Sequence, residues 1–331
     1  MKMERLLMGR ARRAMRAALV AAFAIGCVAG ARSQGLEPFE FVALGDMPYR
    51  AEDEAKVDRL IDRINASKPA FTLHVGDIIS GRTPCSDENL KRSARQLARI
   101  EGPLVYTPGD NEWTDCHRPA GGRFDPQERL EKVRRLMFPS PGLSIGQRPM
   151  PVESQSLVDA NFATFRENVR FVKNGVHFVT AHVVGSNNNY DPDRAGAVQE
   201  FRERNRANIA WLNRAFRLAT DDQARALVIA WQANVHPAKP GANSDAGFGD
   251  MIRAVEQGAL AFRRPVLVVY GDYHFFDVRR FEGPLGRPVP GALKMMVYGD
   301  LHVHAVRVRV DPSSPGVFEF APMIVPENGL P

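Results

Sequence analysis

Short apolar runs alternate with amphipathic stretches in the first third of the chain. The runs predict strands over residues 40–44, 70–75 and 104–107. Between them, apolar side chains recur at helical spacing and predict helices near 57–64 and 88–100. This alternation of strands and helices is typical of parallel strands joined by right-handed crossovers. Ligands of such sheets collect at the carboxyl ends of the strands.

The rest of the chain is predicted to hold a hairpin, two helices and further strands. The Asn174-Gly175 pair stands between two apolar runs, which is a strong signal for a hairpin over residues 168–184. An apolar stripe from Val198 to Phe216 predicts a long helix. The remaining predicted elements are strands at 226–231, 266–270, 293–298, 302–310 and 317–320 and a helix at 250–262. Together they predict one α/β domain in which two sheets are flanked by helices.

A basic stretch followed by an apolar run opens the chain. Arg10–Arg16 is basic, Ala17–Ala31 is apolar, and small residues at the end of the run fit a cleavage site. This pattern predicts a signal peptide over residues 1–33 and an exported protein, periplasmic or secreted. An uncleaved N-terminal anchor is the alternative. No other segment approaches membrane-spanning length, so no stable membrane span is expected after cleavage.

The positive charge of the chain belongs to the leader. The whole sequence has a formal net charge of +6, but residues 34–331 carry 37 basic and 37 acidic side chains. A protein that binds nucleic acid usually shows a basic excess or a basic patch. The neutral remainder therefore gives no electrostatic sign of a nucleic-acid partner.

Two cysteines remain after the leader, Cys85 and Cys116. An even number of cysteines in an oxidising compartment favours a disulfide. Each follows a predicted strand by a few residues, and adjacent strands would bring the two loops together. A pair of unrelated buried thiols is the alternative.

Four aspartates follow glycines at the ends of predicted strands: Asp46, Asp77, Asp110 and Asp272. His274 comes two residues after the last of them. A single Gly-Asp pair is ordinary turn chemistry, because Gly gives the backbone freedom and Asp caps turns. Four carboxylates at one sheet edge, however, repel one another unless a cation neutralises them. A divalent metal ion is the usual answer in proteins.

The order of these pairs resembles the sequence blocks of a known enzyme family. The blocks are Gly45-Asp46-Met47-Pro48, Gly76-Asp77-Ile78-Ile79, Gly109-Asp110-Asn111-Glu112, a weak fourth block near Gln232, and Gly271-Asp272-Tyr273-His274. From Phe39 to the final strands, their order and spacing are similar to those of the calcineurin-like metallophosphoesterases. The resemblance implies a four-layer α/β/β/α sandwich of two mixed sheets flanked by helices, occupying residues 34–331.

The resemblance also implies a dinuclear metal site in which a hydroxide attacks phosphorus. Asp77 would bridge two divalent ions, and the other ligands would be Asp46 and His274 for the first ion and Asp110, Asp272 and Gln232 for the second. Pro48, Gln232 and Asp272 stand where the family has histidines. Such an oxygen-rich set favours Mn²⁺, Mg²⁺ or Ca²⁺, with Fe and Zn as alternatives.

Three further residues are predicted to take part in catalysis: Asn111, Glu112 and His117. Asn111 replaces a histidine that in the family sits near the leaving group. An amide can donate a hydrogen bond to a phosphoryl oxygen but cannot protonate a leaving group. His117 and His236 are therefore the candidates for the missing acid.

The segment 299–304 also resembles the last block of the family. It opens an alternating stretch that predicts a strand with two outward histidines, His302 and His304. The segment 271–274 is preferred, because it follows a purely apolar run and ligands belong at strand ends. Histidines within predicted strands are interpreted as structural: His74, His177 and His182.

The sequence leaves two main functions open. The first is an exported hydrolase of a small phosphorylated substrate, which is a phosphomonoester, a diester or a phosphoanhydride. The second is a degenerate relative that keeps the fold, has lost catalysis and serves as an envelope-associated binding module. A nucleotide-processing enzyme is a weaker third alternative that rests on family analogy alone. Nothing in the sequence specifies the oligomeric state.

Overall fold

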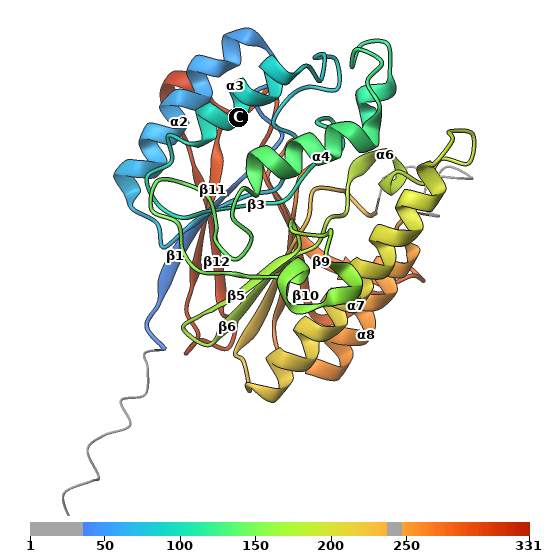
Figure 1. The fold of residues 1–331 in the computed structure, drawn as a ribbon. Coiled ribbons are helices and arrows are strands. Elements are labelled where there is room, and N and C mark those ends of the chain that lie inside the picture. The colour runs from blue at the N-terminus through green and yellow to red at the C-terminus, as the bar shows by residue number, and fades with distance from the viewer. Residues whose placement is uncertain (1–35, 237–246) are drawn as a thin grey trace, which may run out of the picture. The chain divides into compact units, whose positions relative to one another are not determined.

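Two mixed β-sheets lie face to face at the centre of the computed structural model, which describes residues 36–236 and 247–331 (Figure 1). Glu37–Pro331 forms one compact unit. The predicted signal peptide lies outside the described residues. Most elements of this unit begin and end close to the boundaries predicted from the hydrophobic pattern.

The first sheet has five strands in the order β12-β11-β1-β2-β3. Its strands are β1 (Phe39–Leu44), β2 (Thr72–His74), β3 (Leu104–Tyr106), β11 (Ala305–Val310) and β12 (Phe318–Met323). Strands β1, β2 and β3 are parallel, whereas β11 and β12 are antiparallel to their neighbours. The three parallel strands therefore end at the same edge of the sheet.

The second sheet has seven strands in the order β4-β5-β6-β7-β8-β10-β9. Its strands are β4 (Glu153–Ser154), β5 (Val169–Lys173), β6 (Val176–Thr180), β7 (Ala226–Ala230), β8 (Val266–Tyr270), β9 (Asp277–Glu282) and β10 (Pro288–Met296). The predicted hairpin is the antiparallel β5–β6 pair. Strands β6, β7, β8 and β10 are parallel, so their carboxyl ends also meet at one edge.

Apolar side chains from both sheets fill the space between them. Phe41 of β1 and Phe71, which directly precedes β2, stack with ring centroids 5.0 Å apart, and Phe178 of β6 meets both rings edge-on. Leu267 and Val269 belong to the same buried cluster. Because aromatic rings bury large apolar areas, this layer holds the two sheets together.

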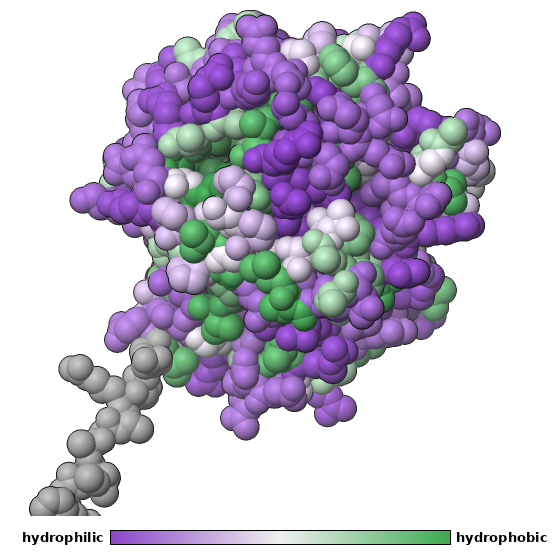
Figure 2. Space-filling view, viewed as in Figure 1, coloured by the Kyte–Doolittle hydropathy of each residue, from purple (hydrophilic) through white to green (hydrophobic). Residues whose placement is uncertain are grey.

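Helices cover the outer face of each sheet. The first sheet is covered by α2 (Glu54–Ser67), α3 (Asp87–Leu97) and α4 (Pro126–Met137), and the second by α7 (Ala197–Asp221) and α8 (Gly249–Phe262). Figure 2 shows a mainly hydrophilic surface over the helices, with hydrophobic side chains gathered near the middle of this face. The predicted four-layer α/β/β/α sandwich is thus confirmed.

The short helical segments are η1 (Ala51–Asp53), η2 (Thr114–His117), α5 (Gln155–Val158), η3 (Ala160–Phe162), α6 (Gly185–Asn188) and η4 (Pro326–Asn328). Helices α3 and α4 begin at N-caps whose side chains accept backbone hydrogen bonds, Ser86 from Asn89 and Asp125 from Glu128. Among the described residues, no helix is both long and apolar enough to cross a bilayer.

The structure differs from the predicted elements at α4, at β9 and at the start of β11. Helix α4 and strand β9 were not predicted, because few apolar residues mark them. The predicted strand over 302–310 begins only at Ala305. His304 is therefore not an outward strand residue; it is buried, and its Nδ1 accepts a hydrogen bond from the Val325 amide.

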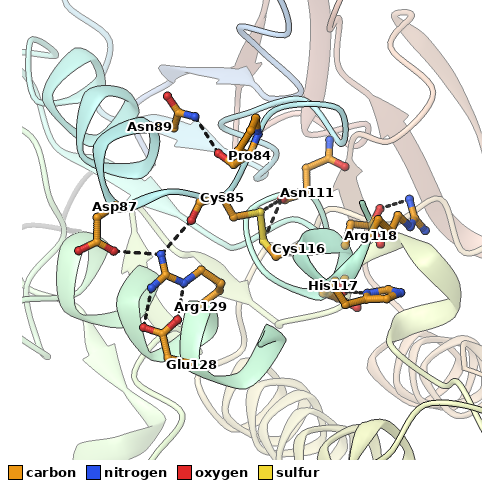
Figure 3. Close-up of a disulfide and its surroundings, with 12 residues drawn as sticks. Pro84, Cys85, Asp87, Asn89, Asn111, Cys116, His117, Arg118, Glu128 and Arg129 are labelled. Atoms are coloured by element: carbon orange, nitrogen blue, oxygen red, sulfur yellow. Dashed lines mark hydrogen bonds and ion pairs between the residues drawn. A yellow bond between two sulfur atoms is a disulfide. The ribbon is translucent and has the colours of Figure 1, made fainter. Parts of the chain in front are cut away.

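A disulfide joins Cys85 and Cys116, as predicted, with the two Cα atoms 5.7 Å apart (Figure 3). It links the segment after β2 to the segment after β3. Both sulfur atoms lie close to the carbonyl oxygen of Asn111, at 3.3 and 3.6 Å. On the other side, Arg129 of α4 donates to the Cys85 carbonyl oxygen at 2.8 Å. The bridge therefore fixes the loop that carries Asn111.

Replacing both cysteines by serine should lower the free energy of unfolding by about 3 kcal/mol, because the disulfide closes a loop of 31 residues in the unfolded chain. Urea unfolding of the double variant and the parent, followed by far-UV circular dichroism, measures the difference. Addition of a thiol reductant should destabilise the parent and leave the double variant unchanged. Equal stability of parent and variant would show that the bridge does not constrain the fold.

Candidate active site

Strand ends from both sheets bring the four predicted aspartates together. Asp46, Asp77 and Asp110 follow β1, β2 and β3, and Asp272 follows β8. Asp77, Asp110 and Asp272 line an open cavity of about 780 Å³, while Asp46 lies fully buried beside them. The predicted His274 lines the same cavity. The structure thus places a carboxylate cluster where the sequence blocks predicted one.

Glycines make the close approach of these carboxylates sterically feasible. A Cβ atom added at Gly109 would lie 2.0 Å from Asp77 Oδ1, and one at Gly271 would lie 2.1 Å from Asp46 Oδ2. Asp46 and Asp77 adopt left-handed backbone angles, with φ of 56° and 57°. Asp tolerates this region better than most residues. The repeated Gly-Asp pair is therefore a packing requirement of the site.

Asp77 is the hub of the hydrogen bonds in the cluster. Its Oδ2 accepts from the Tyr49 hydroxyl at 2.7 Å, from Asn111 Nδ2 at 2.8 Å and from Gln232 Nε2 at 3.2 Å. Its Oδ1 accepts from the backbone amide nitrogen of Asn111 at 3.0 Å. Both oxygens of the predicted bridging carboxylate are therefore occupied by neutral donors.

Asp46 and Asp272 form a second contact between the sheets. The Asp272 amide donates to Asp46 Oδ1 at 3.0 Å, and His274 Nε2 lies 3.8 Å from the same oxygen. Asp272 Oδ2 accepts from the Asn234 amide at 3.0 Å. Asp46 Oδ2 is buried without a hydrogen-bond partner among the described residues. This oxygen faces the cluster with its lone pairs unsatisfied.

Asp110 extends the cluster toward residues that the sequence did not single out. The Ser186 hydroxyl lies 2.7 Å from Asp110 Oδ2 and 2.7 Å from Asp115 Oδ1. Arg118 forms an ion pair with Asp115 and donates to the Ser186 hydroxyl. Within residues 36–236 and 247–331, Asp110 Oδ1 has no hydrogen-bond partner.

Gln232 lies in the cluster, but its amide group is turned away from the predicted ligand role. Its Oε1 accepts from the Gly185 amide at 2.7 Å, which directs Nε2 toward Asp77. Burial raises the pKa values of Asp46 and Asp272, and hydrogen bonding by Gln232 opposes this rise in part. In this arrangement Gln232 donates hydrogen bonds to carboxylates and presents no free oxygen to a metal ion.

Glu112 binds backbone amides of the site without lining the cavity. Its Oε1 accepts from the Tyr106 hydroxyl at 2.6 Å, from the Gly109 amide at 2.7 Å and from the Asp77 amide at 3.2 Å. It is fully buried and does not line the cavity. Glu112 therefore positions the backbone of two neighbouring strand ends.

The three remaining predicted residues lie in different places. Asn111 lines the cavity, and its Nδ2 donates to Asp77 and to the Tyr49 hydroxyl. His117 does not line the cavity; its Nδ1 lies 2.7 Å from the Thr114 carbonyl oxygen. His236 Nε2 lies 2.7 Å from the Glu282 carbonyl oxygen, also outside the cavity lining. Tyr49, which was not predicted, is the hydroxyl closest to Asp77.

Burial dominates the electrostatics of the cluster. It raises the pKa values of Asp46 and Asp77, and burial together with the charge of Asp110 raises the pKa of Asp272 to about 7. Burial lowers the pKa of His274. No Lys or Arg of the described residues forms an ion pair with these aspartates. The cluster therefore carries negative charge that its own cations do not neutralise.

The donor chemistry of the cluster fits a hard divalent cation. Two buried carboxylate oxygens, Asp46 Oδ2 and Asp110 Oδ1, lack partners in the described part of the chain. Oxygen donors of this kind suit Mg²⁺, Mn²⁺ or Ca²⁺. In the described residues, however, no three His, Cys, Asp or Glu side chains are already arranged to hold an ion. A cation at Asp77 Oδ2 would compete with the donors that this oxygen already accepts, Gln232 among them.

Solved structures show where this architecture occurs. The chain is similar to "Structure of PhoD" with a TM-score of 0.53 and 12% identity over 86% of this chain and 68% of that one. It is similar to the purple acid phosphatase PPD1 from yellow lupin (Lupinus luteus) seeds with a TM-score of 0.51 and 9% identity, over 89% of this chain and 55% of that one. Both are calcineurin-like metallophosphoesterases.

The likeness to these two structures confirms the predicted fold. No protein-family model matches the sequence, and no curated protein matches it either. At such low identities, the likeness establishes architecture and not substrate. Any catalytic activity therefore depends on the residues that line the cavity.

In the presence of a chelator, the melting temperature should fall as the pH rises from about 5 to about 8. The folded state favours protonated Asp272, since its pKa is raised from 3.8 to about 7. The stabilisation is complete at low pH and is lost as the pH rises through the folded value. Scanning calorimetry measures the profile. Asp272→Asn removes one of the buried carboxyls with a raised pKa and should make the fall shallower, because Asp46 and Asp77 still titrate. A parent melting temperature that rises with pH would contradict the proposed effect of burial.

Proposed function

We propose that this chain is an exported, metal-dependent phosphoesterase-like hydrolase of a small phosphorylated substrate, either a phosphomonoester, a diester or a phosphoanhydride. One observation carries the proposal. Four strand-end carboxylates and His274 converge at an open, polar cavity that three arginines also line. Arg50 pairs with Asp53 and Asp300, whereas Arg82 and Arg118 are the arginines that this proposal assigns to the substrate. The fold shared with PhoD and the lupin phosphatase agrees with this chemistry.

The metal ligands in this proposal are those that the cavity brings together: Asp46, Asp77, Asp110, Asp272 and His274. Gln232 joins them only if its amide turns over. A carboxylate-rich set holding two ions, with Mn²⁺, Mg²⁺ or Ca²⁺ preferred, extends the family arrangement to these residues. When bound, divalent ions supply Lewis acidity and an activated water.

The arginines orient the anionic group of the substrate. Arg118 is held by Asp115, and its guanidinium also contacts Ser186, so its position is fixed. Arg82 forms no ion pair with a carboxylate in the described part of the chain, although it lines the cavity. An unpaired guanidinium is well suited to a phosphoryl oxygen, because it presents several donors in one plane.

Tyr49 is the general acid in this proposal, because the Asn111 amide cannot protonate a leaving group. Its hydroxyl lines the cavity and is fixed between Asp77 Oδ2 and Asn111 Nδ2, at 2.7 and 2.8 Å. Burial and the neighbouring carboxylates raise its pKa, which keeps the hydroxyl protonated. Tyr49 lines the cavity, and a leaving oxygen would have to replace Asp77 Oδ2 as the acceptor of its hydroxyl proton.

Export is supported by the leader and by the disulfide. The basic and apolar segments of residues 1–33 fit a signal peptide. The Cys85–Cys116 bridge suits an oxidising compartment such as the periplasm or the exterior.

Asp77→Asn should reduce the hydrolysis of an aryl phosphate by at least about a hundredfold, because it removes the central charge that holds a cation. The assay uses aryl mono- and diesters after chelation and after Mn²⁺, Mg²⁺, Ca²⁺ or Zn²⁺ is restored. Asp62→Asn is the matched control, because Asp62 is an exposed acid that pairs with Arg99 outside the cavity.

A second function, a binding module without catalysis, is favoured by the saturation of Asp77 with neutral donors. The same assay distinguishes the hydrolase from the binding module. Turnover that needs a cation and is lost in Asp77→Asn supports the enzyme. Binding of inorganic phosphate without turnover under any metal condition supports the module.

Tyr49→Phe should slow alkyl phosphate esters by about a hundredfold and aryl esters by less than about tenfold, because aryl leaving groups need little protonation. Steady-state kcat for both ester types gives the comparison. Tyr190→Phe removes the same hydroxyl from a tyrosine outside the cavity lining and serves as the control. Equal slowing of both esters would exclude proton donation by Tyr49.

A further inference from the structure

Two loops at the mouth of the cavity carry exposed apolar side chains. One loop follows β8 and contains Tyr273 and Phe275, which are 41% and 44% exposed; the other follows β10 and contains Leu301, which is 63% exposed. Within the same loops, His274 and Asp300 line the cavity. Large apolar side chains next to a polar cavity mark a surface that a ligand can cover.

The two loops form one preorganised rim. Strands β8 and β10 are parallel neighbours, so their loops leave the sheet side by side. The Gly299 amide donates to the His274 carbonyl oxygen at 3.2 Å, and the rings of Phe276 and Tyr298 lie 5.7 Å apart. The Asp300 amide also donates to the Asp46 carbonyl oxygen at 2.8 Å. The apolar rim is thus tied directly to the carboxylate cluster.

The cationic part of the cavity comes from the other sheet. Arg82 lies in the segment after β2, and Arg118 lies in the segment after β3. These guanidinium groups suit an anion, whereas Phe275 and Leu301 offer no hydrogen-bonding group to a sugar or another hydroxylated moiety. The cavity lining therefore offers guanidinium groups to an anion, and the exposed apolar side chains lie outside this lining, next to His274 and Asp300 on the two loops.

We propose that the site selects anionic phosphoesters whose organic group is apolar or aromatic. The phosphoryl group lies toward Arg82 and Arg118, and the organic group covers Phe275 and Leu301. This inference rests on the proposed function for the identity of the anion. The apolar selectivity, however, follows from the rim and does not require turnover.

Binding of two phosphonates that differ only in the organic group tests the inference. Phenylphosphonate and methylphosphonate present the same anion, and their carbon–phosphorus bonds resist hydrolysis. Titration calorimetry on the whole protein with Mn²⁺ should give a dissociation constant about tenfold lower for the phenyl compound, as expected for partial burial of an aromatic ring.

Surface variants assign the preference to the rim. Phe275→Ser and Leu301→Ser should each weaken phenylphosphonate binding about threefold and leave methylphosphonate unchanged, because these side chains contact only the ring. Arg82→Gln should weaken both phosphonates equally. Leu285→Ser is the matched control, since Leu285 is 81% exposed and lies outside the two loops.

The outcomes separate this inference from the proposed function. A phenyl preference that the rim variants abolish supports the inference, even if no phosphate ester is hydrolysed. Equal binding of the two phosphonates, equal weakening of both by the rim variants, or no binding of either overturns it. Metal-dependent hydrolysis with no phenyl preference would leave the proposed function standing and remove the apolar selectivity.

Discussion

Compensation of buried negative charge is the constraint on which the rest of the site depends. Four carboxylates meet at the strand ends of two sheets, and no Lys or Arg of the described residues neutralises them. Two means of compensation are available. Neutral donors satisfy Asp77, and protons are retained because burial raises the pKa values of Asp46, Asp77 and Asp272. A bound cation would replace both the neutral donors and the retained protons. Ion binding would therefore release protons.

The framework around the cluster resists this repulsion. Glu112 holds the Gly109 and Asp77 amides, so the ends of β2 and β3 cannot separate without breaking buried hydrogen bonds. The disulfide fixes the same region from the other side, next to the Asn111 carbonyl oxygen. Glycines allow carboxylates to approach one another where any Cβ atom would collide. The glycines, Glu112 and the disulfide thus determine whether the four aspartates can lie close together.

The sequence predicted the layers and the carboxylate positions well, because apolar periodicity and the Gly-Asp pairs are local signals. It could not predict the role of Tyr49, since nothing local indicates that a residue 28 positions before Asp77 donates to it. It also placed His117 with the catalytic group, although the ring faces its own turn at Thr114. Ser186 was missed for a related reason: its contacts with Asp110 and Asp115 depend on tertiary packing between loops, which periodicity does not record.

The orientation of Gln232 links metal affinity to the hydrogen-bond network. The Gly185 amide holds Oε1, and this contact directs the amide nitrogen toward the carboxylates. Turning the side chain over would place two nitrogens, on Gln232 and Gly185, against each other with no acceptor between them, at the cost of an unsatisfied buried donor. A cation at Asp77 must therefore outcompete donors that are already in place. The neutral donors thus stabilise Asp77 without an ion, whereas Asp46 Oδ2 and Asp110 Oδ1 have no hydrogen-bond partner in the described residues.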